Sequence, residues 1–232
     1  MLRADSPALR LIAALLLGAA SVLAYAPVAW FPLIWVTLGG LFALFNRAAN
    51  ENESARDGAL IGAAFGFGLF ISGVSWVYVS LSVFGGMPAP IAALATFLFC
   101  CLLSAYPALA GALFVRFAPS GWWPRSLLFA ALWVLAEWLR SWVFTGFPWL
   151  AVGYSQVPSS PIAGIAPVLG VYGVSLGTAL FAALLHELLQ RWLSVKACTA
   201  KRWATWCPAV PLLALVLLVT CGALLREQPW TS

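Results

Sequence analysis

Long apolar runs separated by short polar turns dominate the chain. A membrane-spanning helix needs about 20 predominantly apolar residues, and seven stretches meet or approach this length. Apolar residues lie on all sides of these runs, whereas barrel strands alternate polar and apolar residues, so we expect helices. The predicted spans are 9–25, 28–45, 58–83, 90–117, 122–144, 162–190 and 206–225.

The overall composition agrees with this pattern. Hydrophobic residues make up 63% of the chain and charged residues 8%, and the mean hydropathy is +0.98. Soluble domains carry about 25% charged residues, so we predict an all-α integral membrane protein, a bundle of about seven transmembrane helices. Residues 1–225 form this domain, and residues 226–232 begin a linker. The first span resembles a signal peptide, but Pro27 follows the possible cleavage site, and we therefore interpret it as a retained helix.

The basic residues indicate an orientation. The net charge of +5 would also fit a nucleic-acid partner. If the N-terminus is cytoplasmic, however, ten of the twelve basic residues fall in cytoplasmic segments, as the positive-inside rule expects. We therefore predict a cytoplasmic N-terminus, a periplasmic C-terminus and no nucleic-acid partner. The ten residues are Arg3, Arg10, Arg47, Arg56, Arg116, Arg125, Arg191, Lys196, Lys201 and Arg202, and the other two are Arg140 and Arg226.

Two aromatic, glycine-containing stretches lie on the predicted outer side. In the first, WLRSWVFTGFPWLAVGYSQ (138–156), Gly146 and Pro148 break the helix and several aromatic residues surround the break. The second is SWVYVSLSVFGGMP (75–88). Aromatic residues are common at membrane interfaces, and the alternative is that the two stretches form the walls of a lipid or peptide cleft.

One pair of opposite charges lies beside the first stretch. Glu137 and Arg140 share a helix face at i, i+3 spacing. The pair either fixes the helix end as an interfacial ion pair, or Arg140 meets a lipid phosphate or another acidic group.

The remaining reactive residues form no complete catalytic set. The five cysteines are odd in number and contain no CxxC motif, which argues for packing and against a metal site or a disulfide framework. His186 is the only histidine and lies near the predicted inner side. We expect no metal and no cofactor. Gly58, Gly62 and Gly66 have the four-residue spacing that allows close helix packing.

Four motifs resemble those of the apolipoprotein N-acyltransferase family. They are LAYAPVAWFPL (23–33), GFGLFISGVSWVYVSLSVFGGMP (66–88), FTGFPWLAVGYSQ (144–156) and APVLGVYGVS (166–175). The resemblance implies a helical domain in the bacterial inner membrane, joined to a periplasmic nitrilase-like domain with a Glu-Lys-Cys triad. It also implies that the cysteine takes an acyl chain from a phospholipid and passes it to the N-terminal diacylglyceryl-cysteine of an apolipoprotein.

The sequence departs from this pattern at its end. REQPWTS (226–232) stands about where the nitrilase-like domain should begin, and no cysteine has the nucleophile's context. We therefore carry over no catalytic residue and expect this chain alone to be inactive. The resemblance implies contacts with membrane lipid and substrate for Trp76, Tyr78, Phe84, Gly85, Gly86, Arg140, Gly146, Phe147, Pro148, Trp149, Tyr154 and Gln156.

Two other interpretations remain open. The chain is either a scaffold subunit for a separate nitrilase-like chain, or a lipid-handling or transporter-like membrane protein. A transporter predicts a polar pathway through the membrane centre, whereas the charges here lie near the ends of the predicted spans.

Overall fold

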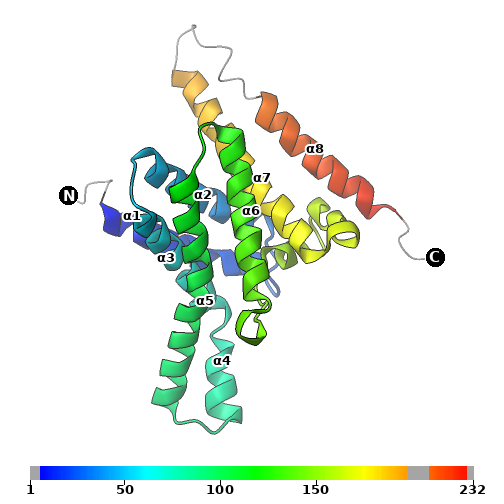
Figure 1. Ribbon diagram of the computed structural model, residues 1–232. Helices are drawn as coiled ribbons and strands as arrows, with labels where there is room; N and C mark the ends of the chain where they lie inside the picture. The colour runs from blue at the N-terminus through cyan, green and yellow to red at the C-terminus, as the bar shows by residue number, and fades with distance from the viewer. Residues whose placement is uncertain (1–5, 198–208, 229–232) are drawn as a thin grey trace.

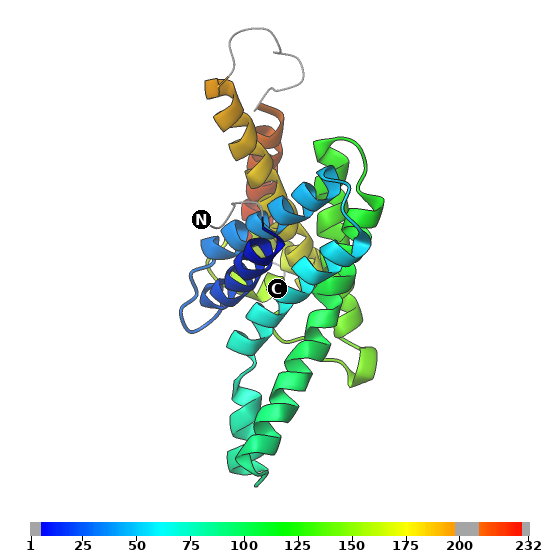
Figure 2. The same cartoon turned by 90° about the vertical axis from the view of Figure 1, so that its left-hand side faces the viewer.

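A computed structural model describes residues 6–197 and 209–228, and every regular element among them is helical (Figures 1 and 2). The all-helical prediction is therefore confirmed. The longer helices are α1 (Pro7–Ser21), α2 (Pro32–Asn50), α3 (Ala55–Gly73), α5 (Ala89–Phe117), α6 (Trp122–Arg140), α7 (Ala166–Ala197) and α8 (Ala209–Arg226). The short ones are η1 (Val22–Ala24), α4 (Trp76–Val79), η2 (Ser80–Phe84), η3 (Val143–Thr145), η4 (Val152–Gln156) and η5 (Pro161–Ile165).

Six helical stretches of the described chain are long and apolar enough to cross a membrane. They are Pro7–Ala24, Pro32–Asn50, Ala55–Gly73, Ala89–Phe117, Pro161–Leu193 and Ala209–Arg226. Helix α6 has 19 residues but is not among the six, because Arg125, Glu137, Arg140 and four tryptophans lower its hydropathy. Its two charges near the C-terminal end, Glu137 and Arg140, are buried inside the protein.

Glycine contacts bring α3 close to both of its neighbours. A Cβ atom on Gly62 would lie 2.1 Å from the carbonyl oxygen of Pro107 in α5. A Cβ atom on Gly68 would lie 2.1 Å from the carbonyl oxygen of Leu15 in α1. Both distances are far below van der Waals contact, so the two helix pairs require glycine at these positions, as small-residue spacing indicates.

An aromatic core joins α2, α5 and α6. The ring centroid of Phe42 lies 5.2 Å from that of Phe129, and the rings of Phe45 and Phe114 stack at 5.7 Å. All four side chains are almost completely buried. This core fixes α6 within the bundle and thereby sets the position at which its C-terminal end emerges.

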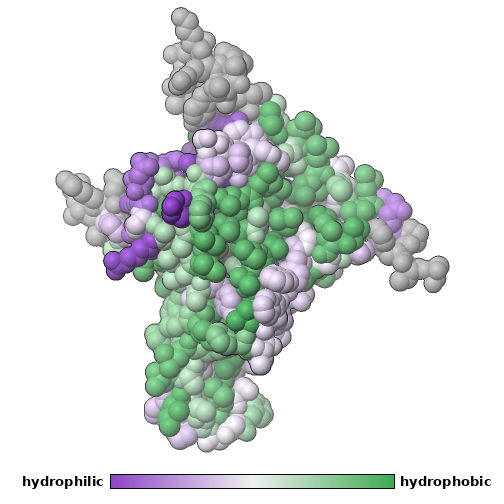
Figure 3. Space-filling model, viewed as in Figure 1, coloured by the Kyte–Doolittle hydropathy of each residue, from purple (hydrophilic) through white to green (hydrophobic). Residues whose placement is uncertain are grey.

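Several basic residues gather at the opposite end of α6 from Arg140. Arg10 forms an ion pair with Glu53 at 2.6 Å, and Arg125 donates a hydrogen bond to Asn50 Oδ1 at 2.6 Å. Hydrophilic side chains are gathered at the upper left of Figure 3, over the turn between α2 and α3. The cytoplasmic location of this end stays a prediction. Residues Arg3, Cys198, Lys201, Arg202 and Cys207 lie outside the described residues.

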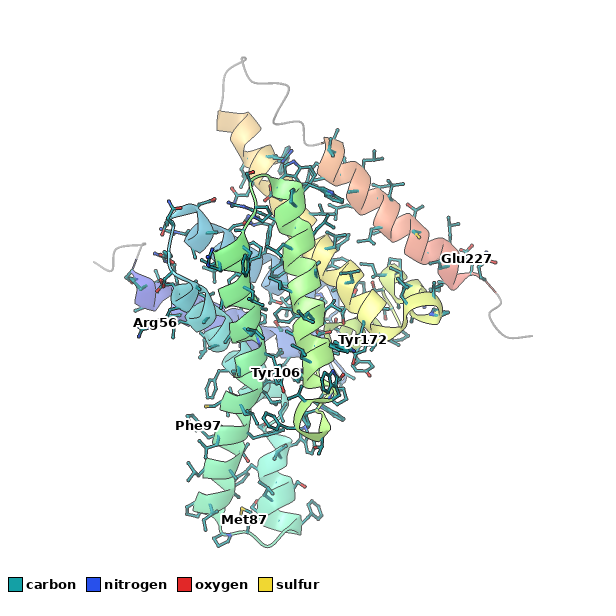
Figure 4. The ribbon with its side chains drawn as sticks, in the orientation of Figure 1. Arg56, Met87, Phe97, Tyr106, Tyr172 and Glu227 are labelled. Atoms are coloured by element: carbon teal, nitrogen blue, oxygen red, sulfur yellow. The ribbon has the colours of Figure 1, made fainter. Side chains whose placement is uncertain are left out.

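One part of the chain stands out from the bundle. Helix α4, η2 and the first half of α5, residues 76–98, form a hairpin that we call the projection (Figures 1 and 2). Met87 lies at its tip, and Phe97 lies on the outer side of α5 (Figure 4). Apolar side chains cover much of the projection's surface in Figure 3.

Candidate functional site

The chain turns back on itself where α6 ends. The amide N–H of Phe147 donates a hydrogen bond of 2.8 Å to the carbonyl oxygen of Arg140, which closes a loop of residues 141–146. Gly146 has a φ of 82°, and a Cβ atom there would lie 2.0 Å from the carbonyl oxygen of Ser141. Only glycine satisfies both conditions without strain, so this residue permits the return of the chain.

Arg140 points into the protein from the end of α6. Its side chain is only 3% exposed, and Nη1 donates to the carbonyl oxygens of Phe147, at 2.7 Å, and of Trp149. Its guanidinium carbon lies 5.1 Å from the ring centroid of Phe70, a cation–π distance. Among the described ion pairs, none joins Arg140 to Glu137. The guanidinium therefore binds backbone carbonyls, and not its helical neighbour.

Glu137 binds the same part of the chain from the preceding turn of α6. Its side chain is 4% exposed, and Oε1 accepts hydrogen bonds from Trp133 Nε1 at 2.9 Å and from the amide of Val152 at 2.8 Å. The hydroxyl of Tyr25, which is distant in sequence, donates to the carbonyl oxygen of Leu150 at 3.0 Å.

One more side chain completes the set of contacts. Ser175 Oγ in α7 accepts a hydrogen bond of 2.8 Å from the amide of Gly153. Side chains therefore satisfy backbone groups at five positions of the irregular segment 147–153. Non-helical backbone near a membrane is tolerated where protein groups satisfy it. We call residues 147–153 the held segment.

The held segment meets the base of the projection through aromatic rings. The ring centroids of Trp76 and Trp149 are 5.5 Å apart, and the two side chains are 45% and 52% exposed. Phe147 packs edge-to-face on Phe99 of α5, with centroids 5.0 Å apart. The structure thus brings together the two aromatic stretches singled out in the sequence. We call Trp76 and Trp149 the aromatic platform.

The other predicted residues of the 75–88 stretch lie along the projection. Tyr78 is exposed on α4, two residues after Trp76. Phe84 is 84% exposed near the tip, where Gly85 and Gly86 connect η2 to the turn before α5. The structure therefore separates the tip residues from the held segment, although they share a sequence motif with Trp76, which contacts Trp149.

The other predicted residues of the 138–156 stretch divide into exposed and buried ones. Pro148, the residue before Trp149, is exposed, and so is Tyr154 in η4. Gln156 is completely buried in η4, and its Nε2 donates to Ser155 Oγ at 2.9 Å. Gln156 therefore has a structural contact inside the protein, whereas Tyr154 extends the aromatic surface.

Two residues that hold the segment were missed at the level of sequence. Tyr25 and Ser175 are polar residues within mainly apolar motifs, 23–33 and 166–175. Both motifs had been recognised for their resemblance to a family, but no role was assigned to either residue. A hydroxyl inside a long apolar stretch was the available signal, since buried polar groups require hydrogen-bond partners.

Reactive side chains are scattered over the described part of the chain. Cys100 is buried in α5, whereas Cys101 and Cys221 are exposed, and all three are free thiols. His186 packs against Phe42, with ring centroids 5.5 Å apart. No group of three or more potential metal ligands occurs in residues 6–197 and 209–228. The predicted site residues that do come together, at Trp76 and Trp149, form an exposed aromatic surface.

The chain as a whole is similar to known proteins of one family. A family model described as the apolipoprotein N-acyltransferase N-terminal domain matches residues 17–184. An apolipoprotein N-acyltransferase of Nitrosomonas europaea is 51% identical over 178 residues, covering 76% of this chain and 35% of the relative. The same-named protein of Ralstonia nicotianae is 44% identical, covering 83% and 37%, and that of Coxiella burnetii is 38% identical, covering 95% and 42%. The chain thus spans 35–42% of the length of these relatives.

Proposed function

The chain belongs to the apolipoprotein N-acyltransferase family, and from this membership we propose that it forms the lipid-binding membrane part of an acyltransferase. The reaction moves an acyl chain from a phospholipid to the α-amino group of the diacylglyceryl-cysteine at an apolipoprotein N-terminus. The proposed location is the bacterial inner membrane, with the aromatic platform on the periplasmic side. Six candidate spans and the basic end of the bundle support this location.

The observation that carries the proposal is the contact between Trp76 and Trp149. Two half-exposed indole rings, 5.5 Å apart, come from stretches more than seventy residues apart in the sequence. Indole rings suit a site that contacts acyl chains on one side and headgroups on the other. We propose that the platform holds the donor phospholipid close to its ester bond.

The covalent chemistry of the proposed reaction needs an activated nucleophile. A general base takes the proton of a cysteine thiol, and the thiolate attacks the acyl ester. The carbon–oxygen bond breaks, and the lysophospholipid leaves as an alcohol with the proton that the base returns. The acceptor amine then attacks the thioester, the carbon–sulfur bond breaks, and the amine's proton passes through the base to the thiolate, which regenerates the thiol. We propose that this nucleophile lies outside the part of the relatives that the chain matches, since Cys100, Cys101 and Cys221 are helical residues with no assigned base.

A substitution in a full-length relative tests the role of the platform. Trp149→Ala, made at the matching position, should lower acyl transfer about tenfold or more, because one aromatic wall of the lipid site is lost. The matched control is Trp142→Ala, which removes an equally exposed tryptophan outside the platform. Triacylated product is measured with a diacylated lipopeptide acceptor. Equal transfer by both variants would show that the platform is not used.

A second assay uses this chain by itself. Reconstituted with phospholipid and a diacylated lipopeptide, it should insert into the membrane and give no triacylated product. Recovery of that product would contradict the proposal that the nucleophile lies elsewhere.

A further inference from the structure

Two buried charges of opposite sign lie on successive turns at the end of α6. Glu137 and Arg140 are 4% and 3% exposed, and each makes hydrogen bonds to the held segment, with Glu137 also accepting one from Trp133 of its own helix. Buried charges are strongly unfavourable unless they are hydrogen-bonded and compensated. Here the two opposite charges compensate each other across one helical turn, but their hydrogen bonds go to Trp133 and to the backbone of the held segment, so these contacts need an explanation beyond a simple ion pair.

The charges match the backbone groups that they contact. The carboxylate of Glu137 accepts from an N–H group, at Val152. The guanidinium of Arg140 donates to carbonyl oxygens, at Phe147 and Trp149. An ion pair would tolerate an exchange of the two residues. This arrangement does not, because the exchanged side chains would face backbone groups of the wrong polarity.

The contacts fix the backbone on both sides of the exposed indole. Arg140 binds the carbonyl of Phe147, before the indole, and that of Trp149 itself, and Glu137 binds the amide of Val152, three residues later. Between them, Leu150 has a φ of 58°, a strained value for a non-glycine residue. A strained conformation persists where its surroundings determine it. The orientation of the Trp149 side chain relative to the backbone therefore depends on both charges.

We propose that Glu137 and Arg140 are positioning residues, which together orient Trp149 against Trp76 without touching the substrate. This assignment of their role in acyl transfer rests on the proposed function. It also argues against the alternative that Arg140 binds a lipid phosphate. The guanidinium faces backbone carbonyls and is nearly inaccessible from outside the protein. The backbone contacts themselves are testable without any acyltransferase activity.

Hydrogen–deuterium exchange of this chain in phospholipid nanodiscs tests the contacts directly. Arg140→Gln should raise amide exchange in residues 147–153 about tenfold or more, because the bonds of a charged donor are lost. Exchange in α2 should stay unchanged, which separates local release from general unfolding. The matched control is Arg125→Gln, since Arg125 also binds neutral oxygen atoms but at the other end of α6. Unchanged exchange at 147–153 in Arg140→Gln would overturn the proposal.

A charge exchange distinguishes the proposal from an ordinary ion pair. The double variant Glu137→Arg/Arg140→Glu keeps the net charge but places each charge against backbone groups of the wrong polarity. Its amides in residues 147–153 should exchange hydrogen as fast as those of Arg140→Gln. Restoration of slow exchange would overturn the proposal. For a background less prone to misfolding, Glu137→Gln and Glu137→Leu are compared. The glutamine side chain retains an acceptor for the Val152 amide, so residues 147–153 should exchange more slowly in Glu137→Gln than in Glu137→Leu. Equal exchange rates in the two variants would also overturn the proposal.

Activity provides a separate readout. In a full-length relative, Arg140→Lys at the matching position should raise KM for phospholipid more than it lowers kcat, since lysine donates to fewer carbonyls in a fixed geometry. Altered exchange with unchanged transfer would refute the proposed function of the platform and leave the backbone contacts established. Unchanged exchange would refute the positioning role whatever the activity.

Discussion

The projection and the held segment meet at the aromatic platform but are stabilised in different ways. In the held segment, side chains from α6, α7 and the chain after η1 bind the backbone at five positions. In the projection, the backbone is mainly helical, and side chains such as Val83 and Phe84 are 68% and 84% exposed. Helices satisfy their own backbone, so the projection needs few partners, whereas an irregular segment needs one for nearly every polar group. Trp149 is consequently fixed by contacts with the bundle, whereas Trp76 belongs to a projection that joins the bundle mainly at its base.

The largest effect is expected from breaking the held segment. Arg140→Leu removes the donor to two carbonyls and leaves Glu137 buried without its compensating charge. We expect a loss of about 3–5 kcal/mol in the free energy of unfolding, measured by thermal unfolding in detergent. Phe84→Leu in the projection serves as the control and should be nearly neutral. Similar losses in the two variants would remove the distinction between the regions.

Substitution of one glycine with positive φ in each region compares how tightly the two backbones are held. Gly146, at the entry to the held segment, has a φ of 82° and no space for a Cβ atom. Gly86, near the projection tip, has a φ of 64° and nothing within 4 Å of a Cβ atom. Gly146→Ala should therefore cost about 2–3 kcal/mol, and Gly86→Ala about 1 kcal/mol. The reverse order in a denaturation series would contradict the comparison.

Substitution of one exposed aromatic residue in each region compares how much their side chains contribute to stability. Trp149→Ala removes the contact with Trp76 and should cost about 1–2 kcal/mol. Phe84→Ala removes a ring that is 84% exposed and should change stability by no more than about 0.5 kcal/mol. Unfolding in one detergent gives both values. A larger loss for Phe84 would mean that the projection tip packs more tightly than the structure indicates.

The smallest effect lies far from both regions, in the turn after α2. The side-chain hydrogen bond from Arg47 lowers the pKa of Glu51 below its ordinary value of 4.5. A carboxyl whose pKa is lower in the folded state stabilises the protein above its ordinary pKa, and this contribution is lost as the pH falls through the lowered value. Arg47→Ala should thus flatten a small decrease in stability below about pH 4.5. An unchanged pH profile would show that the bond does not form in solution.

Much of the fold follows from the sequence because each long apolar run must satisfy its own backbone. The break at Gly146 and Pro148 and the meeting of the two aromatic stretches were also predictable. The partners of Arg140 were not. Spacing of i, i+3 favours contact with Glu137, but the chain folds back and presents carbonyl oxygens to the guanidinium instead.

Contacts across long sequence separations explain the rest of what was missed. Tyr25 reaches Leu150 across 125 residues, and no local pattern identifies such a pair. The span predicted at 122–144 includes α6, but its sequence pattern did not show that Glu137 and Arg140 turn into the protein and bind backbone groups there. Propensity and periodicity describe helices well, but they carry little information on side chains that hold irregular backbone.

The loop of residues 141–146 has a practical consequence that follows from its closed ends. The hydrogen bond from the amide of Phe147 to the carbonyl oxygen of Arg140 joins the two ends of the loop. Closing a longer loop adds only a small entropic cost, about 0.6 kcal/mol for each doubling of its length. An epitope or a small fluorogenic tag placed after Phe144, whose side chain is 77% exposed, should therefore leave the helices undisturbed. Such a tag would report from intact cells which side of the membrane this end of α6 occupies.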